Sequence, residues 1–162
     1  MLAFSDMDEI HEATAADVPE VATLIRSVLA EFTLEFGVGS ATDAQVLSLP
    51  GSYIENGGCF WIARAGETLL GCAGVFPIDA RIFELRKMYL HPRARGRGVG
   101  KRLLETVVAW AIAHGAKLLV LDTVEEMTRA IAFYEANGFV RDDSQIRGSR
   151  CTRGYARLLA SE

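Results

Sequence analysis

A short stretch in the middle of the chain alternates glycine with basic residues, between an apolar run and a pattern typical of a helix. It reads Arg95-Gly-Arg-Gly-Val-Gly-Lys101. A strand, a glycine-rich turn and a helix N-terminus in this order bind phosphate well, because glycines let the backbone come close and the first helical amides favour negative charge. Eight of the 17 Lys and Arg residues lie between positions 81 and 102, opposed there by Glu84 alone. An anionic ligand is therefore expected at this stretch.

Two common phosphate-binding motifs do not fit here. A Walker A loop would end at Gly100-Lys101, but it needs glycine at position 95 and Ser or Thr at position 102, and both positions hold arginine. The dinucleotide motif GxGxxG, started at Gly96, fails at Lys101. The pattern R-x-x-G-x-G fits without mismatch, on Arg95, Gly98 and Gly100.

Two further segments accompany this motif. The strand before it reads Glu84-Leu-Arg-Lys-Met-Tyr-Leu90, and a block some thirty residues after it reads Ala130-Ile-Ala-Phe-Tyr-Glu-Ala-Asn-Gly-Phe139. Together the three segments resemble the GNAT superfamily of N-acyltransferases, in family order, and the likeness covers nearly the whole chain. The resemblance implies an enzyme that uses acetyl-CoA as its cosubstrate.

The resemblance also implies which residues hold acetyl-CoA. The amides between Arg95 and Lys101 would cradle the pyrophosphate, and Arg95, Arg97 and Lys101 would add positive charge. The backbone of Met88 and Leu90 would pair with the pantetheine arm as an added strand does. The implied cofactor-binding residues are Met88, Tyr89, Leu90, Arg95, Gly96, Arg97, Gly98, Val99, Gly100, Lys101 and Tyr134.

The strand that ends at Leu90 has two further expected features. The family's β-bulge would splay it from the strand at 117–123 and so admit the cofactor. Tyr89 is expected on the opposite strand face from Glu84, in the core, because side chains alternate along a strand. Met127 departs from the family, since relatives often carry Asn there in contact with pantetheine, so Met127 is given no role.

The implied reaction is direct transfer of an acetyl group to a primary amine of a small molecule or amino acid. An alkyl amine with a pKa near ~10 is mostly protonated at neutral pH, so a positioned base is useful. Glu84 is the candidate base, eleven residues before Arg95; alternatively it is ion-paired to Arg81 or Arg86 without chemistry. Tyr134 is the candidate acid for the departing thiol, or else a core aromatic. The Met88 amide is the candidate oxyanion donor.

The acceptor is less well specified. Residues 1–60 hold ten acids against one base, Arg26, which suits a cationic amine. Glu31, Glu35 and Asp43 are the nearest candidate ligands, and a solvated acidic face is the plainer interpretation. Two other functions stay open: a protein acetyltransferase for N-termini or lysines, and a CoA-binding sensor without turnover.

Hydrophobic periodicity predicts a single α/β (α+β) domain over residues 1–162, with a mixed sheet and helices on both faces. The resemblance implies the GNAT-like acyl-CoA N-acyltransferase fold, a twisted sheet of about six or seven strands with a splayed central strand pair for CoA. Expected strands are 10–14, 59–65, 68–78, 81–90, 117–123, 139–145 and 151–159. Expected helices are 21–32, 43–49 (ended by Pro50-Gly51), 98–114 and 125–137.

Composition narrows the classes of partner. The chain of 162 residues is 50% hydrophobic and 23% charged, and no uncharged window exceeds 11 residues, so no membrane partner is expected. The sequence pI of 5.4 opposes nucleic-acid binding. Met1–Ile10 carries three acids and no base, unlike a targeting segment, which favours a cytoplasmic protein. Family habit favours a homodimer through the C-terminal strands.

Metal and disulfide chemistry are not expected. The histidines show no ligand spacing with each other or with the cysteines, so no metal site is predicted. Cys59, Cys72 and Cys151 are widely spaced in strand-like runs, where a free thiol fills the core.

Overall fold

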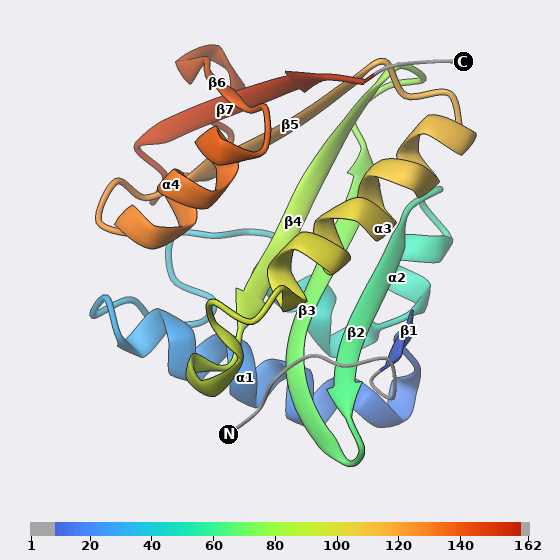
Figure 1. The fold of residues 1–162 in the computed structure, drawn as a ribbon, viewed down its shortest axis with the longest axis vertical. Coiled ribbons are helices and arrows are strands. Elements are labelled where there is room, and N and C mark those ends of the chain that lie inside the picture. The colour runs from blue at the N-terminus through green and yellow to red at the C-terminus, as the bar shows by residue number, and fades with distance from the viewer. Residues whose placement is uncertain (1–8, 160–162) are drawn as a thin grey trace.

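The computed structural model describes residues 9–159, which form one seven-stranded mixed sheet between helical layers (Figure 1). The strands, in the sheet order β1-β2-β3-β4-β5-β7-β6, are β1 (Glu9–Glu12), β2 (Cys59–Ala65), β3 (Thr68–Pro77), β4 (Ile82–Leu90), β5 (Leu118–Thr123), β7 (Arg153–Leu158) and β6 (Val140–Arg141). The α-helices are α1 (Val18–Ala30), α2 (Gly51–Ile54), α3 (Val99–Ala113) and α4 (Thr128–Ala136). The expected fold class is confirmed.

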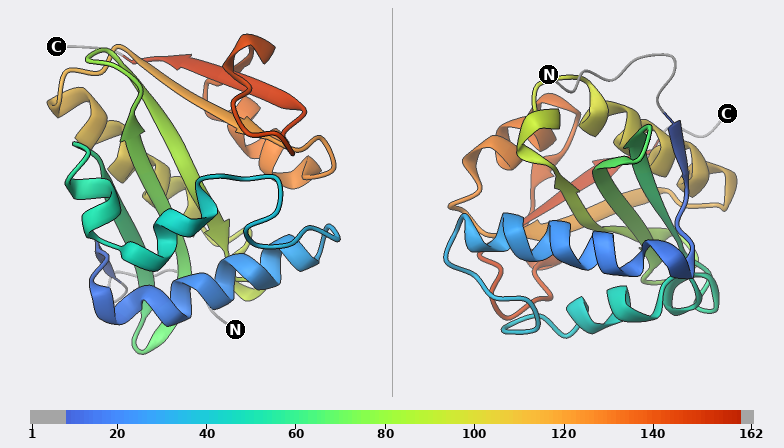
Figure 2. Two further views of the ribbon diagram at one scale, coloured as in Figure 1. Left: turned by 180° about the vertical axis from the view of Figure 1, so that it is seen from behind. Right: turned by 90° about the horizontal axis from the view of Figure 1, so that it is seen from below.

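The sheet separates two hydrophobic clusters. On one face, the apolar stripe of α1, which includes Val21, Ile25 and Leu29, packs on inward residues of β2 and β3. On the other face, α3 packs through Leu103 and Val107, and α4 joins the same cluster. Figure 2 shows α1 and α2 on one side of the sheet and α3 on the other. Because both faces are covered, the inner strands are apolar almost throughout.

The sheet divides into two leaves at β4. This strand pairs with β3 along most of its length, but it pairs with β5 at only three positions, Ile82–Glu84 against Leu118–Val120. Beyond Glu84 the two strands diverge, as Figure 1 shows. The expected splay is therefore present. It leaves the facing backbone edges of β4 and β5 unpaired in the middle of the sheet.

A β-bulge lies where β4 leaves β5. Arg86 is opposite Gly74 and Tyr89 is opposite Cys72, so β4 has one more residue than β3 in this interval. The bulge is at Lys87, whose φ of 55° is in the left-handed region. An added residue reverses the alternation of faces beyond it. Tyr89 consequently packs on the same α1-side cluster as Phe76, the partner of Glu84, and the expectation that Tyr89 and Glu84 face opposite ways is wrong.

Several boundaries differ from the sequence expectation. Residues Asp43–Ser48 form a 3-10 turn, and Pro50 caps the start of α2 instead of ending a helix. The strand expected at 139–145 has only two residues, because Asp142 accepts a hydrogen bond from the Ser144 amide and turns the chain into a 3-10 segment. Helix α4 begins at Thr128, three residues later than expected. These differences shorten elements but leave the topology unchanged.

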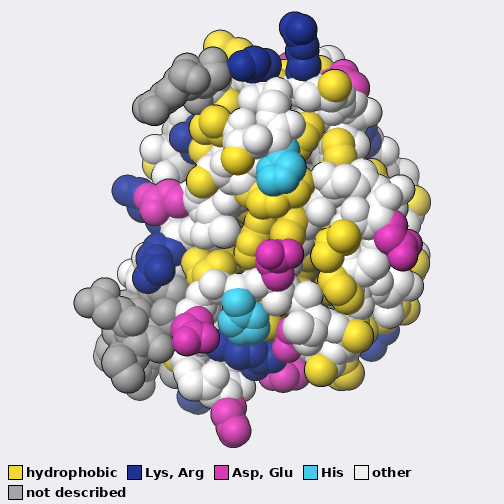
Figure 3. Space-filling model, turned by 90° about the vertical axis from the view of Figure 1, so that its right-hand side faces the viewer, with side chains coloured by type: hydrophobic (Ala, Val, Ile, Leu, Met, Phe, Trp, Pro, Cys, Tyr) yellow, Lys and Arg dark blue, Asp and Glu magenta, His cyan; other side chains and the backbone are white. Residues whose placement is uncertain are grey.

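No helix within residues 9–159 has the length and apolar character needed to cross a bilayer. On the side of the molecule seen in Figure 3, acidic and basic side chains are scattered around a stripe of hydrophobic ones.

Candidate active site

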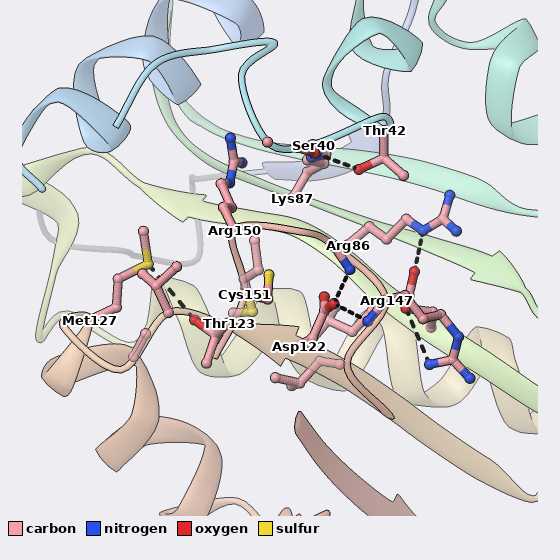
Figure 4. A pocket seen from close by; sticks show the side chains of 18 of the residues that line it. Ser40, Thr42, Arg86, Lys87, Asp122, Thr123, Met127, Arg147, Arg150 and Cys151 are labelled. Carbon is pink, nitrogen blue, oxygen red and sulfur yellow. Dashed lines mark hydrogen bonds and ion pairs between the residues drawn. The ribbon is translucent and has the colours of Figure 1, made fainter. Parts of the chain in front are cut away.

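A cavity of about 390 Å³ opens where β4 and β5 diverge (Figure 4). Residues 84–89 of β4 and 121–123 of β5 form its walls, and Met127, Ala130 and Tyr134 close it from the α4 side. Two loops, 39–42 and 147–151, cover it from the α1 side. The cavity is therefore lined by residues from both sides of the sheet.

Glu84 is buried in the cavity wall, with 4% of its surface exposed. Its Oε1 accepts a hydrogen bond from Arg86, so the expected ion pair with Arg86 is present. Its Oε2 is buried without a hydrogen bond, although Arg147 Nη1 lies 3.5 Å away, within ion-pair distance. One oxygen thus orients the carboxylate, while the other is left without a hydrogen-bond donor. A buried carboxylate oxygen without a hydrogen-bond donor destabilises the fold unless a ligand or a water molecule donates a hydrogen bond to it.

Tyr134 lies on α4 at the other side of the cavity. Its ring packs against Phe139 and Tyr155, at centroid distances of 5.7 Å and 6.5 Å. No described residue hydrogen-bonds to its hydroxyl, and the side chain lines the cavity. Burial raises the pKa of the Tyr134 phenol above its usual value, so the group stays protonated at neutral pH. Tyr134 is therefore a core aromatic that also borders the cavity, and its role as an acid stays a prediction.

Asp43 joins the two covering loops. It has no exposed surface and pairs with Lys87 at the bulge and with Arg150, whose Nη1 lies 3.0 Å from Oδ2. Burial opposes its ionisation, but hydrogen bonds from Lys87, the Gly37 amide and Arg150 bring its pKa below the usual value. Both oxygens of Asp43 are bonded to protein groups, so this residue holds the bulge of β4 and the two covering loops together.

The loop at 147–151 is held from β5. Asp122 accepts hydrogen bonds from the amides of Arg147 and Gly148, each at 2.7 Å. On the far side of the loop, the Arg150 amide and the Ser149 hydroxyl both donate to the Gly39 carbonyl at 3.1 Å. The loop is therefore fixed at both ends, and it covers the cavity.

Cys151 lies in this loop, before β7, and lines the cavity instead of filling the core as expected. Burial, together with Asp122, raises the pKa of its thiol to about 12. It is therefore not a thiolate at neutral pH. Cys59 and Cys72 are buried, as the sequence analysis expected.

The glycine-rich stretch forms the N-terminus of α3. Gly98 caps the helix with a φ of +83°, and Gly96 has a φ of +72°. A Cβ on either glycine would meet nothing within 4 Å, so both backbones face open space. The amides of Val99, Gly100 and Lys101 begin the helix and have no intrahelical acceptor. This is the geometry expected for a phosphate cradle.

The three basic side chains of this stretch differ in their surroundings. Arg95 donates two hydrogen bonds to Glu31 of α1, at 2.7 Å and 2.8 Å, and so ties the loop to α1. Arg97 and Lys101 are exposed and make no ion pair with another described residue. Arg95 therefore positions the loop, while Arg97 and Lys101 offer positive charge to a ligand.

Four acids of the first sixty residues pair with bases from later in the chain: Asp17 and Glu20 with Arg64, Glu31 with Arg95, and Asp43 with two cations. Glu35, the third candidate acceptor ligand, is exposed, pairs with no described base and does not line the cavity. None of the acids described before position 60 lines the cavity. Four bases line the cavity instead, against Glu84 and Asp122; they are Arg86, Lys87, Arg147 and Arg150.

Comparison with known proteins assigns the chain to a family. Residues 25–139 match the acetyltransferase (GNAT) family. The uncharacterized N-acetyltransferase YjgM of Escherichia coli is 33% identical over 134 residues, which are 80% of either chain. The chain therefore belongs to the GNAT family, and it is an acyltransferase.

Solved structures share this fold. A GNAT-family acetyltransferase from Staphylococcus aureus has a TM-score of 0.86 at 24% identity, over 94% of this chain and 99% of that one. The protein yncA from Salmonella typhimurium, solved with its cofactor acetyl-CoA, has a TM-score of 0.76 at 15% identity, over 97% of this chain and 96% of that one.

Proposed function

We propose that this acyltransferase moves an acetyl group from acetyl-CoA directly to a primary amine of a small molecule or amino acid. One observation carries the proposal. One cavity between β4 and β5 is bordered by a carboxylate oxygen without a hydrogen bond and by a neutral phenol to which no described residue hydrogen-bonds. The first group suits a base and the second suits an acid.

The proton movements follow from this arrangement. Glu84 Oε2 takes the proton from the acceptor nitrogen as that nitrogen attacks the thioester carbonyl. The new C–N bond gives a tetrahedral intermediate, whose oxyanion accepts a hydrogen bond from the Met88 amide on the unpaired edge of β4. The C–S bond then breaks, and Tyr134 donates its proton to the departing thiolate. Glu84 releases its proton to solvent and Tyr134 takes one up from solvent, which restores both groups. The products are the acetylated amine and free CoA.

Binding of the cosubstrate is assigned to two parts of the chain. The edge of β4 beyond Glu84 can pair with the pantetheine arm, because β5 does not occupy it. The α3 N-terminus, with Arg97 and Lys101, can hold the pyrophosphate. Gly100 lies against Leu90, 3.2 Å from a would-be Cβ, so the cradle adjoins the end of that strand.

The covering loops favour a small acceptor over a polypeptide. Loops 39–42 and 147–151 are hydrogen-bonded to each other across the acceptor side, so an extended peptide would have to displace them. A thiol-release assay tests this, with acetyl-CoA and separate panels of amines, amino acids and peptides. Release with small amines or amino acids is expected. Release with peptides alone would favour protein acetylation, and acetyl-CoA binding without release would favour a sensor.

A further inference from the structure

The cavity has more positive than negative charge, arranged as two triads. In the first, Asp43 is shared by Lys87 and Arg150. In the second, Glu84 is shared by Arg86 and Arg147. Each triad combines one carboxylate with two cations. Asp122 also lines the cavity, so the four cations face three carboxylates and one net positive charge remains. In a half-enclosed cavity such an excess favours a ligand that brings an anionic group.

Three of the four cations are already engaged. The side chains of Lys87 and Arg150 are only 6% and 11% exposed and are bonded to Asp43. Arg86 is bonded to Glu84 through Nε and to Gln45 through Nη1 at 3.1 Å, and its guanidinium lies 4.0 Å above the Phe76 ring. These groups hold the walls of the cavity and cannot reorient without losing buried contacts.

Arg147 differs from the other three. Its side chain is 37% exposed, and its hydrogen bonds are to the carbonyl and amide oxygens of nearby Gln145. Its backbone is fixed by Asp122, so the guanidinium is presented at the cavity from a rigid base. Arg147 can exchange its exposed hydrogen bonds to Gln145 for stronger, charge-assisted hydrogen bonds to an anionic ligand at a small cost in free energy.

Glu84, the neighbour of Arg147, indicates which other group a ligand with an anionic group must carry. Arg147 Nη1 lies 3.5 Å from Glu84 Oε2, the oxygen proposed to receive the acceptor amine. A ligand that satisfies both groups therefore carries its amine and its anion close together. We propose that the acceptor is an α-amino carboxylate, whose amine binds Glu84 and whose carboxylate binds Arg147. This inference rests on the proposed function and names its acceptor class.

The assignment reverses the expectation from net charge. The acid-rich first sixty residues suggested a cationic acceptor, but none of the acids described in that segment lines the cavity, and four of them pair with later bases. A diamine would place a second ammonium beside Arg147, where like charges repel. An α-amino acid places opposite charges on each of its two protein partners.

The test compares matched acceptors in the thiol-release assay. For each of glycine, alanine, methionine, phenylalanine and glutamate, the free amino acid is compared with its carboxamide and with its decarboxylated amine. β-Alanine tests the spacing of the two groups, and 1-aminoethylphosphonate tests whether the anion must be a carboxylate. At least one amino acid is expected to exceed its amide and its amine by about tenfold or more in kcat/KM, as one charge-assisted bond implies.

Variants then assign the preference to one side chain. Arg147→Gln is expected to lower kcat/KM for the preferred amino acid about 10- to 100-fold and to change the value for the matching amine less than threefold. For Arg147→Lys, kcat/KM for the preferred amino acid is expected to lie between the values of the wild type and Arg147→Gln. Arg141→Gln is the control, because Arg141 is 47% exposed, pairs only with Asp143 and does not line the cavity. Melting temperatures should stay within a degree or two for all three.

The contrary outcomes are distinct. Equal rates for acid and amine, or a preference for diamines, would overturn the acceptor class while leaving the proposed function in place. An equal loss for acid and amine in Arg147→Gln would show that Arg147 acts on structure. No thiol release with any acceptor, despite acetyl-CoA binding, would overturn the proposed function and this inference with it.

Discussion

The hydroxyl of Tyr134 can be removed without disturbing what surrounds it. Tyr134→Phe keeps the ring, and with it the edge contacts to Phe133 and Phe139. No described residue hydrogen-bonds to this hydroxyl, so its removal leaves no protein group unsatisfied. We therefore expect the free energy of unfolding to change by less than about 0.5 kcal/mol. We expect kcat to fall about 10- to 1,000-fold, the range for one proton donor.

Tyr155→Phe is the matched control. Tyr155 packs in the same ring cluster, but its hydroxyl donates to Glu135 at 3.0 Å and the residue does not line the cavity. Losing a hydrogen bond to a carboxylate costs about 1.5 kcal/mol or more, which lowers Tm by about 3–6 °C in a chain of this size. The two variants should therefore show opposite effects: Tyr134→Phe loses turnover and keeps Tm, while Tyr155→Phe loses Tm and keeps turnover.

Steady-state thiol release and thermal unfolding, measured on both variants, show whether the Tyr134 hydroxyl has a catalytic or a structural role. KM for acetyl-CoA should change little in Tyr134→Phe, because the lost interaction belongs to the transition state. Normal kcat in Tyr134→Phe would remove this residue from the mechanism. A fall in Tm as large as that of Tyr155→Phe would show that the hydroxyl has a structural partner.

Three more predictions follow from the same structure. Glu84→Gln should lower kcat/KM about 10²- to 10⁴-fold at neutral pH, with partial recovery at high pH and unchanged acetyl-CoA affinity by calorimetry; retention of a third of the activity would refute the base assignment. Gly98→Val should abolish acetyl-CoA binding, whereas Gly66→Val, which has φ +59° and equally open space in the β2–β3 turn, should retain it; equal affinities would refute the cradle. Asp43→Asn should lower the free energy of unfolding by about 3–5 kcal/mol, because two buried cations lose their charged partner. The pKa of Asp43 is depressed in the fold, so the stability that its charge contributes is complete above the ordinary carboxyl pKa of ~3.9 and is lost as the pH falls through the folded value. The difference in urea unfolding free energy between wild type and Asp43→Asn should therefore begin to shrink below about pH 4 and continue to shrink as the pH is lowered further.

Contiguous features of the sequence predicted their structures well. The glycine-rich stretch and the helix after it depend on neighbours along the chain, so Gly98 at the α3 cap could be expected from the order of residues alone. The same holds for the apolar stripes of α1 and α3, which follow from helical periodicity. The splay was expected too, but only through the resemblance to a family.

Features that combine distant segments could not be predicted. The Asp43–Lys87–Arg150 triad joins residues separated by 44 and 107 positions, and no local pattern indicates their meeting. Arg147 could have been noticed as one of two arginines in a short Gly-Ser loop, Arg147-Gly-Ser-Arg150. The strand face of Tyr89 was predicted wrongly because the prediction assumed that side chains alternate regularly along β4. The bulge at Lys87 inserts one extra residue, and no sequence pattern indicates it.

Because the sheet divides into two leaves, unpaired backbone lies inside the sheet as well as at its rims. Most sheets have their free backbone edges at the outside, but this one has two more inside, on β4 beyond Glu84 and on β5 beyond Val120. A free strand edge is a template for another extended chain, which is how sheet proteins aggregate. A pantetheine arm that pairs with β4 would therefore also occupy one of these edges. Acetyl-CoA in the buffer should then lower the aggregation rate on heating by more than an equally stabilising ligand that leaves β4 uncovered.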